Sequence, residues 1–182
     1  MPSLNHITLA VMLFSSLSTF GRQGKFLSGL EEISPQNLTV IRMQISPTDL
    51  LSKPGEKPYR VGSKFRIKVI VRNDSDQRVM VRFVDPYYQN RPRLFRNGQL
   101  LTYRKKIAEL VRSKDASPEF SNLKHFVSLN PYSSADLEEL DLSDWYEALE
   151  PGSYRLINRY RLDIDGPWTA DSEPLSFEVV SH

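Results

Sequence analysis

The chain has 182 residues, no cysteine and a formal charge of +2 at pH 7. The missing cysteine excludes disulfide bonds, thiolate catalysis, cysteine-ligated zinc sites and iron–sulfur clusters. A charge this small does not by itself indicate a nucleic-acid partner, because nucleic-acid-binding domains are usually much more basic.

The first 20 residues predict a signal peptide. They contain no Lys, Arg, Asp or Glu, and an apolar run at residues 7–14 precedes Ser16 and Ser18, small residues that suit cleavage. The run is shorter than the roughly 20 residues of a membrane span, so none is expected in the mature protein. The segment also lacks the usual basic start of a signal, and the alternative is an apolar helix packed on the domain.

Residues 21–37 predict a linker, because glycine, serine, proline and charge are mixed there without a period. The folded domain is expected at residues 38–182. Its first strand is predicted from residue 38 to residue 45, where apolar side chains alternate.

A polar turn at residues 73–76 separates two alternating segments and predicts a hairpin between them. The inward residues of this hairpin would be Phe65, Ile67, Val69 and Val71 before the turn and Val79, Val81 and Phe83 after it.

Asn97-Gly98 predicts a second hairpin, between residues 93–96 and 99–103, because both residues of the pair tolerate positive φ. Apolar spacing then becomes helical between residues 104 and 114. Further strands are predicted at 123–129, 136–142 and 154–162, and a last one around residues 175–179.

Pro151 and Gly152 form a turn signal directly before Tyr154, the first inward residue of the next strand. This arrangement predicts a tyrosine corner, in which the hydroxyl bonds to backbone a few residues upstream. Frequent turns and inward alternation predict an all-β fold. We expect an immunoglobulin-like antiparallel β-sandwich of seven or eight strands, with at most one or two short helices.

Two resemblances follow from these motifs. The segment 129–161, which contains the corner, resembles small exported bacterial immunoglobulin-like β-sandwich proteins of unknown function. The polar turn at 73–76 with its flanking valines is similar to the asparagine-serine turn of the bacterial proteinase-inhibitor sandwich domain. The second resemblance implies protease inhibition as one alternative function, and no inhibitory residue can be transferred.

Charge is distributed unevenly along the chain. Residues 78–114 contain ten basic and two acidic residues, a net charge of +8, whereas residues 115–150 carry −8. The two segments either neutralise each other across the surface or leave a basic face for a polyanion. The polyanion alternative would use the basic segment 91–106.

Two tyrosines and two arginines in the proline-bounded loop 85–93 have the composition of a recognition surface. With the basic residues that follow them, they define a candidate binding surface. Its members are Tyr87, Tyr88, Arg91, Arg93, Arg96, Arg104, Lys105 and Lys106.

The sequence offers no comparable catalytic or metal-binding pattern. His125 is the one histidine outside the predicted signal and the last residue, and we expect a strand histidine there. Asp163 and Asp165 lack the distal ligands of a calcium loop, so a plain turn is expected. Glu138 and Glu139 are adjacent on a predicted strand and would face opposite sides.

These features predict a cofactor-free, non-catalytic binding or structural module located outside the cytoplasm, in the periplasm or secreted. The expected partner is another protein or a component of the cell envelope, with a polyanion as the alternative. Specific nucleic-acid recognition is not expected.

Export predicts that the mature protein begins between about Ser18 and Lys25, because signal peptidase cleaves after the small residues that follow the apolar run. Intact-mass analysis of protein from the native host measures this directly. Recovery of the full-length chain from the cytosol would contradict export and favour the apolar helix.

Overall fold

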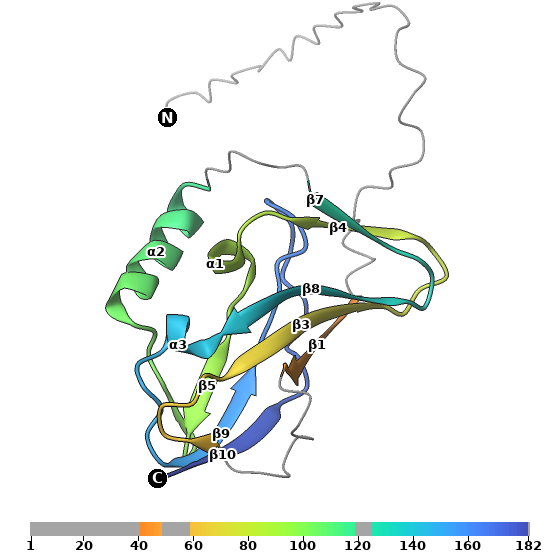
Figure 1. Cartoon of the computed structure of the whole chain (residues 1–182). Helices are drawn as coiled ribbons and strands as arrows, with labels where there is room; N and C mark the ends of the chain where they lie inside the picture. Colours follow the sequence, from red (N-terminus) through yellow and green to blue (C-terminus); the bar gives the residue numbers. More distant parts are fainter. Residues whose placement is uncertain (1–40, 49–58, 119–124, 182) are drawn as a thin grey trace, which may run out of the picture. The chain divides into compact units, whose positions relative to one another are not determined.

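Ten strands and three helices form the described part of the chain, residues 41–48, 59–118 and 125–181, in this computed structural model (Figure 1). All of it belongs to the second of two compact units, Glu31–His182. The predicted signal peptide and linker lie outside the described residues. In chain order the elements are β1 (Ile41–Pro47), β2 (Tyr59–Arg60), β3 (Arg66–Asn73), β4 (Val79–Phe83), α1 (Pro86–Gln89), β5 (Arg93–Arg96), β6 (Gln99–Leu100), α2 (Lys105–Ala116), β7 (His125–Leu129), β8 (Ser134–Asp141), α3 (Leu142–Trp145), β9 (Gly152–Ile157) and β10 (Leu175–Val180).

The strands form three sheets, with the orders β1-β3-β8, β2-β10-β9-β5-β6 and β4-β7. Every pairing is antiparallel except the two-residue contact of β2 with β10. Inward side chains of all three sheets share one hydrophobic core. The expected all-β, immunoglobulin-like sandwich is confirmed. Its strands outnumber the expected seven or eight partly because β2 and β6 have two residues each, and there are three helices rather than one or two.

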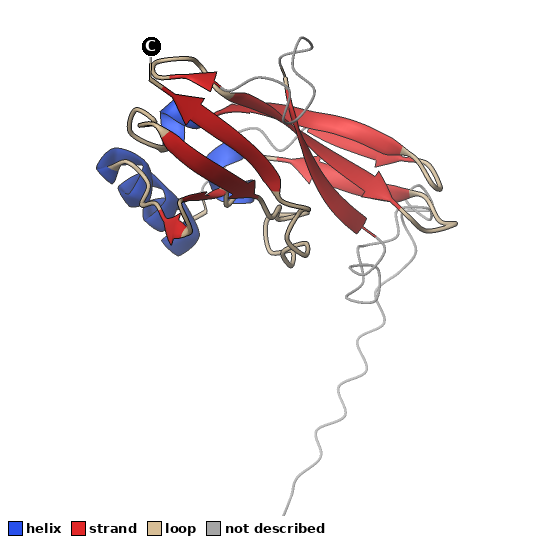
Figure 2. Cartoon of the chain, turned by 90° about the horizontal axis from the view of Figure 1, so that it is seen from below, coloured by secondary structure: helices blue, strands red, loops and turns tan. Residues whose placement is uncertain are grey.

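Strict alternation in β3 builds one wall of this core. Ile67, Val69 and Val71 are fully buried, whereas Lys68 and Ile70 between them are half-buried and the flanking Arg66 and Arg72 are exposed. The opposite wall is reached through aromatic contacts, because the ring of Phe65 stacks on that of Phe177 in β10 with centroids 4.0 Å apart. Figure 2 shows the helices gathered toward one end of the strands.

The predicted hairpin between β3 and β4 is wrong. A strand has two edges, and those of β3 are taken by β1 and β8, with Val71 opposite Met43 on one side and Ala135 on the other. No edge remains for β4, which pairs with β7 instead. The turn at 73–76 therefore carries the chain from one sheet to another.

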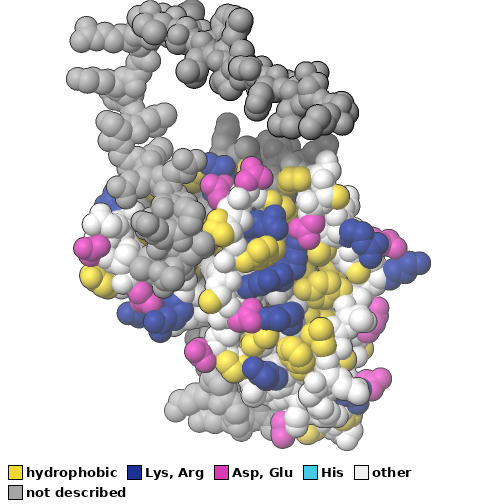
Figure 3. Space-filling view, turned by 180° about the vertical axis from the view of Figure 1, so that it is seen from behind, with side chains coloured by type: hydrophobic (Ala, Val, Ile, Leu, Met, Phe, Trp, Pro, Cys, Tyr) yellow, Lys and Arg dark blue, Asp and Glu magenta, His cyan; other side chains and the backbone are white. Residues whose placement is uncertain are grey.

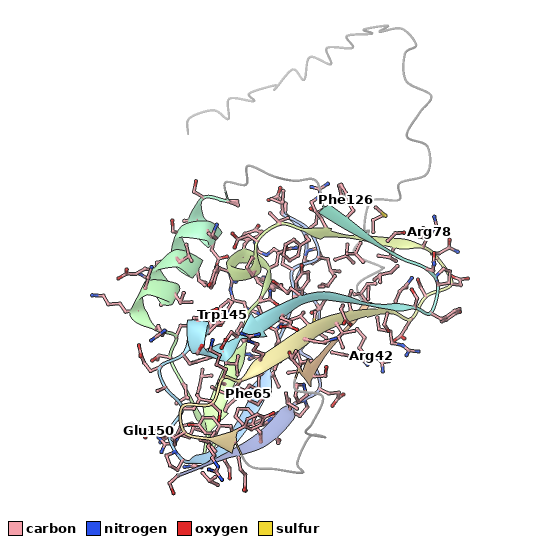
Figure 4. The ribbon with its side chains drawn as sticks, in the orientation of Figure 1. Arg42, Phe65, Arg78, Phe126, Trp145 and Glu150 are labelled. Carbon is pink, nitrogen blue, oxygen red and sulfur yellow. The ribbon has the colours of Figure 1, made fainter. Side chains whose placement is uncertain are left out.

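The side chain of Asn73 fixes this crossing, the connection that leads from β3 in one sheet to β4 in another. Its buried side-chain amide donates to the carbonyl oxygens of Gln77 at 2.7 Å and Asn130 at 3.1 Å, and its oxygen accepts from the amide of Ser75. Asn130 belongs to the second crossing, between β7 and β8. One amide thus fastens both crossings at the same end of the sandwich, where Figure 4 labels Arg78.

The second predicted hairpin and the helix are confirmed. Asn97 and Gly98 have φ angles of 48° and 84°, and Arg96 pairs with Gln99 across the turn. In α2, Ile107 and Val111 are buried on one face, as the helical spacing predicted.

The tyrosine corner is also confirmed. The hydroxyl of Tyr154 donates to the carbonyl oxygen of Glu150 at 2.7 Å, and its ring stacks on Phe177 with centroids 5.2 Å apart. Pro151 and Gly152 make the turn between them, and the guanidinium of Arg96 donates to the Pro151 carbonyl at 2.9 Å. Figure 4 labels Glu150 at the end of the sandwich away from Arg78.

Removing the hydroxyl at this corner should destabilise the domain. Tyr154→Phe leaves the Glu150 carbonyl without its donor, and we expect a loss of roughly 1 to 3 kcal/mol in the free energy of unfolding. Tyr132→Phe is the matched control, because the Tyr132 side chain is exposed. Urea denaturation of both variants tests this, and equal stability of Tyr154→Phe and the parent would contradict the structural role of the corner.

Candidate functional site

In one extended segment, residues 154–162, some side chains point into the core and others point to the outer face of the sheet. Leu156, Tyr160 and Leu162 are fully buried in the core. Arg155 and Arg159 are exposed, because successive side chains of an extended chain point to opposite sides. The sequence therefore places arginines on the outer face of the β5-β9-β10 sheet.

Strand β5 and Arg91, two residues before it, add to the same outer face. Phe95 pairs directly with Arg155, and the backbone amide of Arg91 donates to the carbonyl of Arg159 at 3.1 Å. Residues opposite each other in a sheet share a face. We call this surface the arginine face, and its basic members are Arg91, Arg93, Arg155, Arg159 and Arg161.

Trp168 organises the arginine face. The guanidinium carbons of Arg91 and Arg159 lie 4.8 Å from the centre of its ring, and that of Arg161 lies 4.5 Å away. Arg161 also stacks on Tyr88 at 4.3 Å. Attraction between each cation and the ring offsets part of the repulsion among the three arginines. The ring therefore holds three positive charges together.

Acidic residues neutralise only part of this charge. Asp115 at the end of α2 pairs with Arg91 at 2.5 Å and approaches Arg161 at 3.8 Å, and Asp171 pairs with Arg93. Within the described residues, no ion pair joins Arg155 or Arg159 to a carboxylate. Figure 3 shows a face on which basic and hydrophobic side chains alternate.

The structure divides the predicted binding surface among several environments. Tyr88 and Arg91 are buried, and the Arg91 guanidinium donates to the carbonyl of Tyr87 at 2.8 Å as well as to Asp115. Tyr87 is half-buried, with its ring 5.1 Å from that of Trp145. These contacts hold α1 against its neighbours.

The remaining members lie farther along the chain. Arg96 pairs with Glu150 at 2.5 Å, and Arg104 pairs with Glu147 at 3.3 Å. With the pair between Arg91 and Asp115, these contacts join the basic segment to the acidic one. Lys105 and Lys106 are exposed in the first turn of α2. The prediction of one binding surface from all eight residues stays a prediction.

A polar network lies directly behind the arginine face. Asn158 is buried and its side-chain amide donates to the oxygen of Asn90 at 2.9 Å, while its own oxygen accepts from the backbone of Arg91 at 3.1 Å. The amide of Asn90 in turn donates to the carboxylate of Glu138 in β8. The network thus bridges the β1-β3-β8 sheet and the β5-β9-β10 sheet.

Glu138 faces inward because of its register. It lies opposite Val69, which is fully buried, and Glu139 lies opposite Lys68 on the outer side. Burial raises the pKa of Glu138 to about 7, the hydrogen bond from Asn90 opposes the rise, and the negative charge of Asp85 adds to it. Tyr160 lies nearby, and its buried hydroxyl has no hydrogen-bond partner among the described residues.

No group of three or more metal-ligating side chains occurs among the described residues. Asp163 forms a local turn, in which its carbonyl accepts from the amide of Gly166 at 3.2 Å, as the sequence predicted. The described part of the chain also holds no helix long and apolar enough to cross a membrane.

Comparisons with known proteins found few likenesses. No family model matches the chain, and neither does any curated protein. A CARDB domain from Pyrococcus furiosus, solved in complex with di-metal ions, matches 77% of this chain and 87% of its own at 16% identity, with a TM-score of 0.34. A β-glucosidase from Listeria innocua, solved with glucose, matches 76% of this chain at 15% identity, with a TM-score of 0.35. The match spans 16% of the β-glucosidase chain. These likenesses carry no argument about a site or ligand.

Arg155, Arg159 and Arg161 were not predicted as members of a binding surface, although they alternate with the core residues Leu156, Tyr160 and Leu162 that were predicted. The alternation itself was the signal. The role of Trp168 and the inward direction of Glu138 depend on contacts with distant segments, and no local pattern indicates them.

The raised pKa of Glu138 predicts that stability depends on pH. The folded chain binds the proton of the Glu138 carboxyl group more tightly than the unfolded chain, in which the pKa of this group is near 4.5. The contribution of the protonated carboxyl group to stability therefore falls as the pH rises from about 4.5 through 7. As the pH rises from 5 to 8.5, the free energy of unfolding of Glu138→Gln should therefore increase, relative to that of the parent, by up to about 3 kcal/mol.

Glu139→Gln is the matched control, since it removes the same charge from the exposed side of the strand. Denaturant melts of the three proteins across this pH range give the comparison. A stability difference between Glu138→Gln and the parent that does not change with pH would contradict the proton-binding role of the half-buried Glu138.

Proposed function

We propose that this protein is a non-catalytic binding module, exported from the cytoplasm, which binds an anionic polymer through the arginine face. The observation that carries the proposal is the position of Arg155 and Arg159. Both are exposed beside a sheet packed with further arginines, and in the described residues neither has a carboxylate partner. Neutralisation by an external anion would lower the repulsion among these cations.

The spacing of the arginines suits a linear ligand. Residues 155, 159 and 161 lie along one extended segment, and with about 3.3 Å per residue the row is about 20 Å long. Arg155 lies in β9, which is paired on both sides, and the backbones of Arg159 and Arg161 are hydrogen-bonded to those of Arg91 and Gln89, so the positions of these backbones are fixed before binding. A rigid row of charges loses little conformational freedom when a polymer binds along it.

The aromatic contacts favour an acidic polysaccharide over a nucleic acid. Proteins that bind single strands commonly stack bases on exposed aromatic rings. Three guanidinium groups already lie within 4.8 Å of the centre of the Trp168 ring, which leaves little ring surface for a base. The face therefore offers charge and hydrogen-bond donors, which sulfate, phosphate and carboxylate groups accept.

The likeness of residues 129–161 to small exported immunoglobulin-like proteins agrees with this proposal, because a module outside the cytoplasm meets the acidic polysaccharides of cell envelopes. Export and the absence of catalysis remain part of the proposal.

Heparin, a sulfated polysaccharide, is a suitable probe. The double variant Arg155→Ala/Arg159→Ala should bind heparin about tenfold more weakly than the parent at low salt, because two exposed charge contacts are worth roughly 1 to 2 kcal/mol together. The double variant should also elute from a heparin column at a lower salt concentration than the parent. Both proteins should retain the same unfolding curve, since both side chains lie on the surface.

Lys105→Ala/Lys106→Ala is the matched control, because it removes two exposed charges from α2. Its affinity for heparin should stay close to that of the parent. Equal losses in both double variants would indicate non-specific charge attraction and contradict a defined site. Tighter binding of single-stranded DNA than of heparin would favour a nucleic-acid ligand instead.

A further inference from the structure

Glu138 lies behind the strands that carry the arginine face. The side chains linked to it are the inward neighbours of the arginines along the chain: Asn90 precedes Arg91, and Asn158 precedes Arg159. Two hydrogen bonds lead from the Glu138 carboxylate through Asn90 to Asn158. The carboxylate is therefore separated from the arginine face by about one layer of backbone.

An ionised Glu138 has little local compensation. Asn90 donates one hydrogen bond to it, while the other groups that face it are the carboxylate of Asp85 at the start of α1 and the phenol of Tyr160. Throughout the described ranges, no ion pair joins Glu138 to a basic side chain. On its own strand, Asp136 pairs with Lys68 on the outer side, and Glu139 is exposed.

We propose that Glu138 makes anion binding depend on pH, so that the arginine face binds a polyanion more tightly when Glu138 is protonated than when it is ionised. This inference rests on the proposed function and adds its regulation. Loss of the proton places a negative charge behind the face and lowers the positive potential that attracts the ligand.

The size of the effect follows from distance and burial. The carboxylate and the guanidinium row are on the order of 10 Å apart, because packed sheets have that spacing. Through the poorly screened interior, one charge at this distance changes affinity for an anion by roughly three- to tenfold. The change should be centred near pH 7, where burial places the pKa of Glu138.

Asn90 makes the effect electrostatic rather than conformational. Its amide can donate equally to a carboxylate, to the carbonyl oxygen of a protonated carboxyl group or to the amide oxygen of a glutamine. Glu138→Gln therefore keeps the hydrogen bond and fixes the neutral state. It should bind as the parent does at low pH.

The experiment measures the affinity of the full chain for a fluorescent heparin oligosaccharide between pH 5.5 and 8.5 at constant ionic strength. The parent should lose roughly three- to tenfold in affinity with a midpoint near pH 7, and Glu138→Gln should lose much less. Glu139→Gln should retain the pH dependence of the parent. His125→Gln should retain it as well; this control is included because histidine is the side-chain type that ordinarily changes charge near neutral pH.

Binding that is independent of pH, or a pH dependence that survives in Glu138→Gln, would overturn this inference and leave the proposed function intact. No binding by the parent at any pH would overturn the proposed function, and the inference with it.

A second measurement does not depend on the folding of the variant. By linkage, saturation with heparin should raise the pKa of Glu138 in the parent, as followed by NMR of its carboxyl carbon. An identical pKa with and without heparin would overturn the inference.

Discussion

The structure depends most on one extended segment, residues 154–162, whose side chains alternate between the core and the outer face except at Ile157, which is buried between Leu156 and Asn158. Its backbone is paired on both sides: Arg161 donates to the carbonyl of Gln89, and Tyr160 accepts from the amide of Thr169, both at 2.8 Å. This pairing prevents the segment from twisting away from either neighbour. The same geometry that places Tyr154 and Leu156 in the core therefore places Arg155 and Arg159 on the surface, so core and candidate site cannot vary independently.

Buried amides hold the irregular parts of the sandwich around this segment. Gln89 donates to the carbonyls of Arg82 at 2.7 Å and Arg161 at 2.9 Å and accepts from the amide of Val84 at 2.6 Å, so it connects α1 to the end of β4 and to the segment that follows β9. Asn73 does the same for the two sheet crossings. Each amide supplies partners for backbone groups that no regular pairing reaches, since such groups are costly to bury unpaired. Glu138 belongs to this system of side chains, but it alone can gain or lose a charge there.

Local patterns in the sequence predicted the strands, the turn at Asn97-Gly98 and the tyrosine corner, because each depends on residues close together in the chain. Which strands pair with each other was harder to predict. The turn after β3 suggested a hairpin, yet the edges of β3 were taken by β1 and by β8, more than 60 residues later in the chain. The inward direction of Glu138 follows from an extra residue, Leu137, in the pairing of β8 with β3, which no local pattern indicates. The arginines of the arginine face could have been predicted from the alternating pattern in the sequence. Their contacts with Trp168 and Asp115 could not, because these residues come close to the arginines only in the folded chain.

The claim that binding occurs on the arginine face is tested most directly by NMR of arginine side chains. The Nε–Hε signals of all arginines can be followed while a heparin oligosaccharide is added to the protein. We predict that the signals of Arg155 and Arg159 shift most. The signals of Arg42 and Arg72, which pair with Asp74 directly after the end of β3, should stay unchanged. Shifts concentrated on Arg104 and Arg112 of the α2 region, or no shifts at all, would contradict the account.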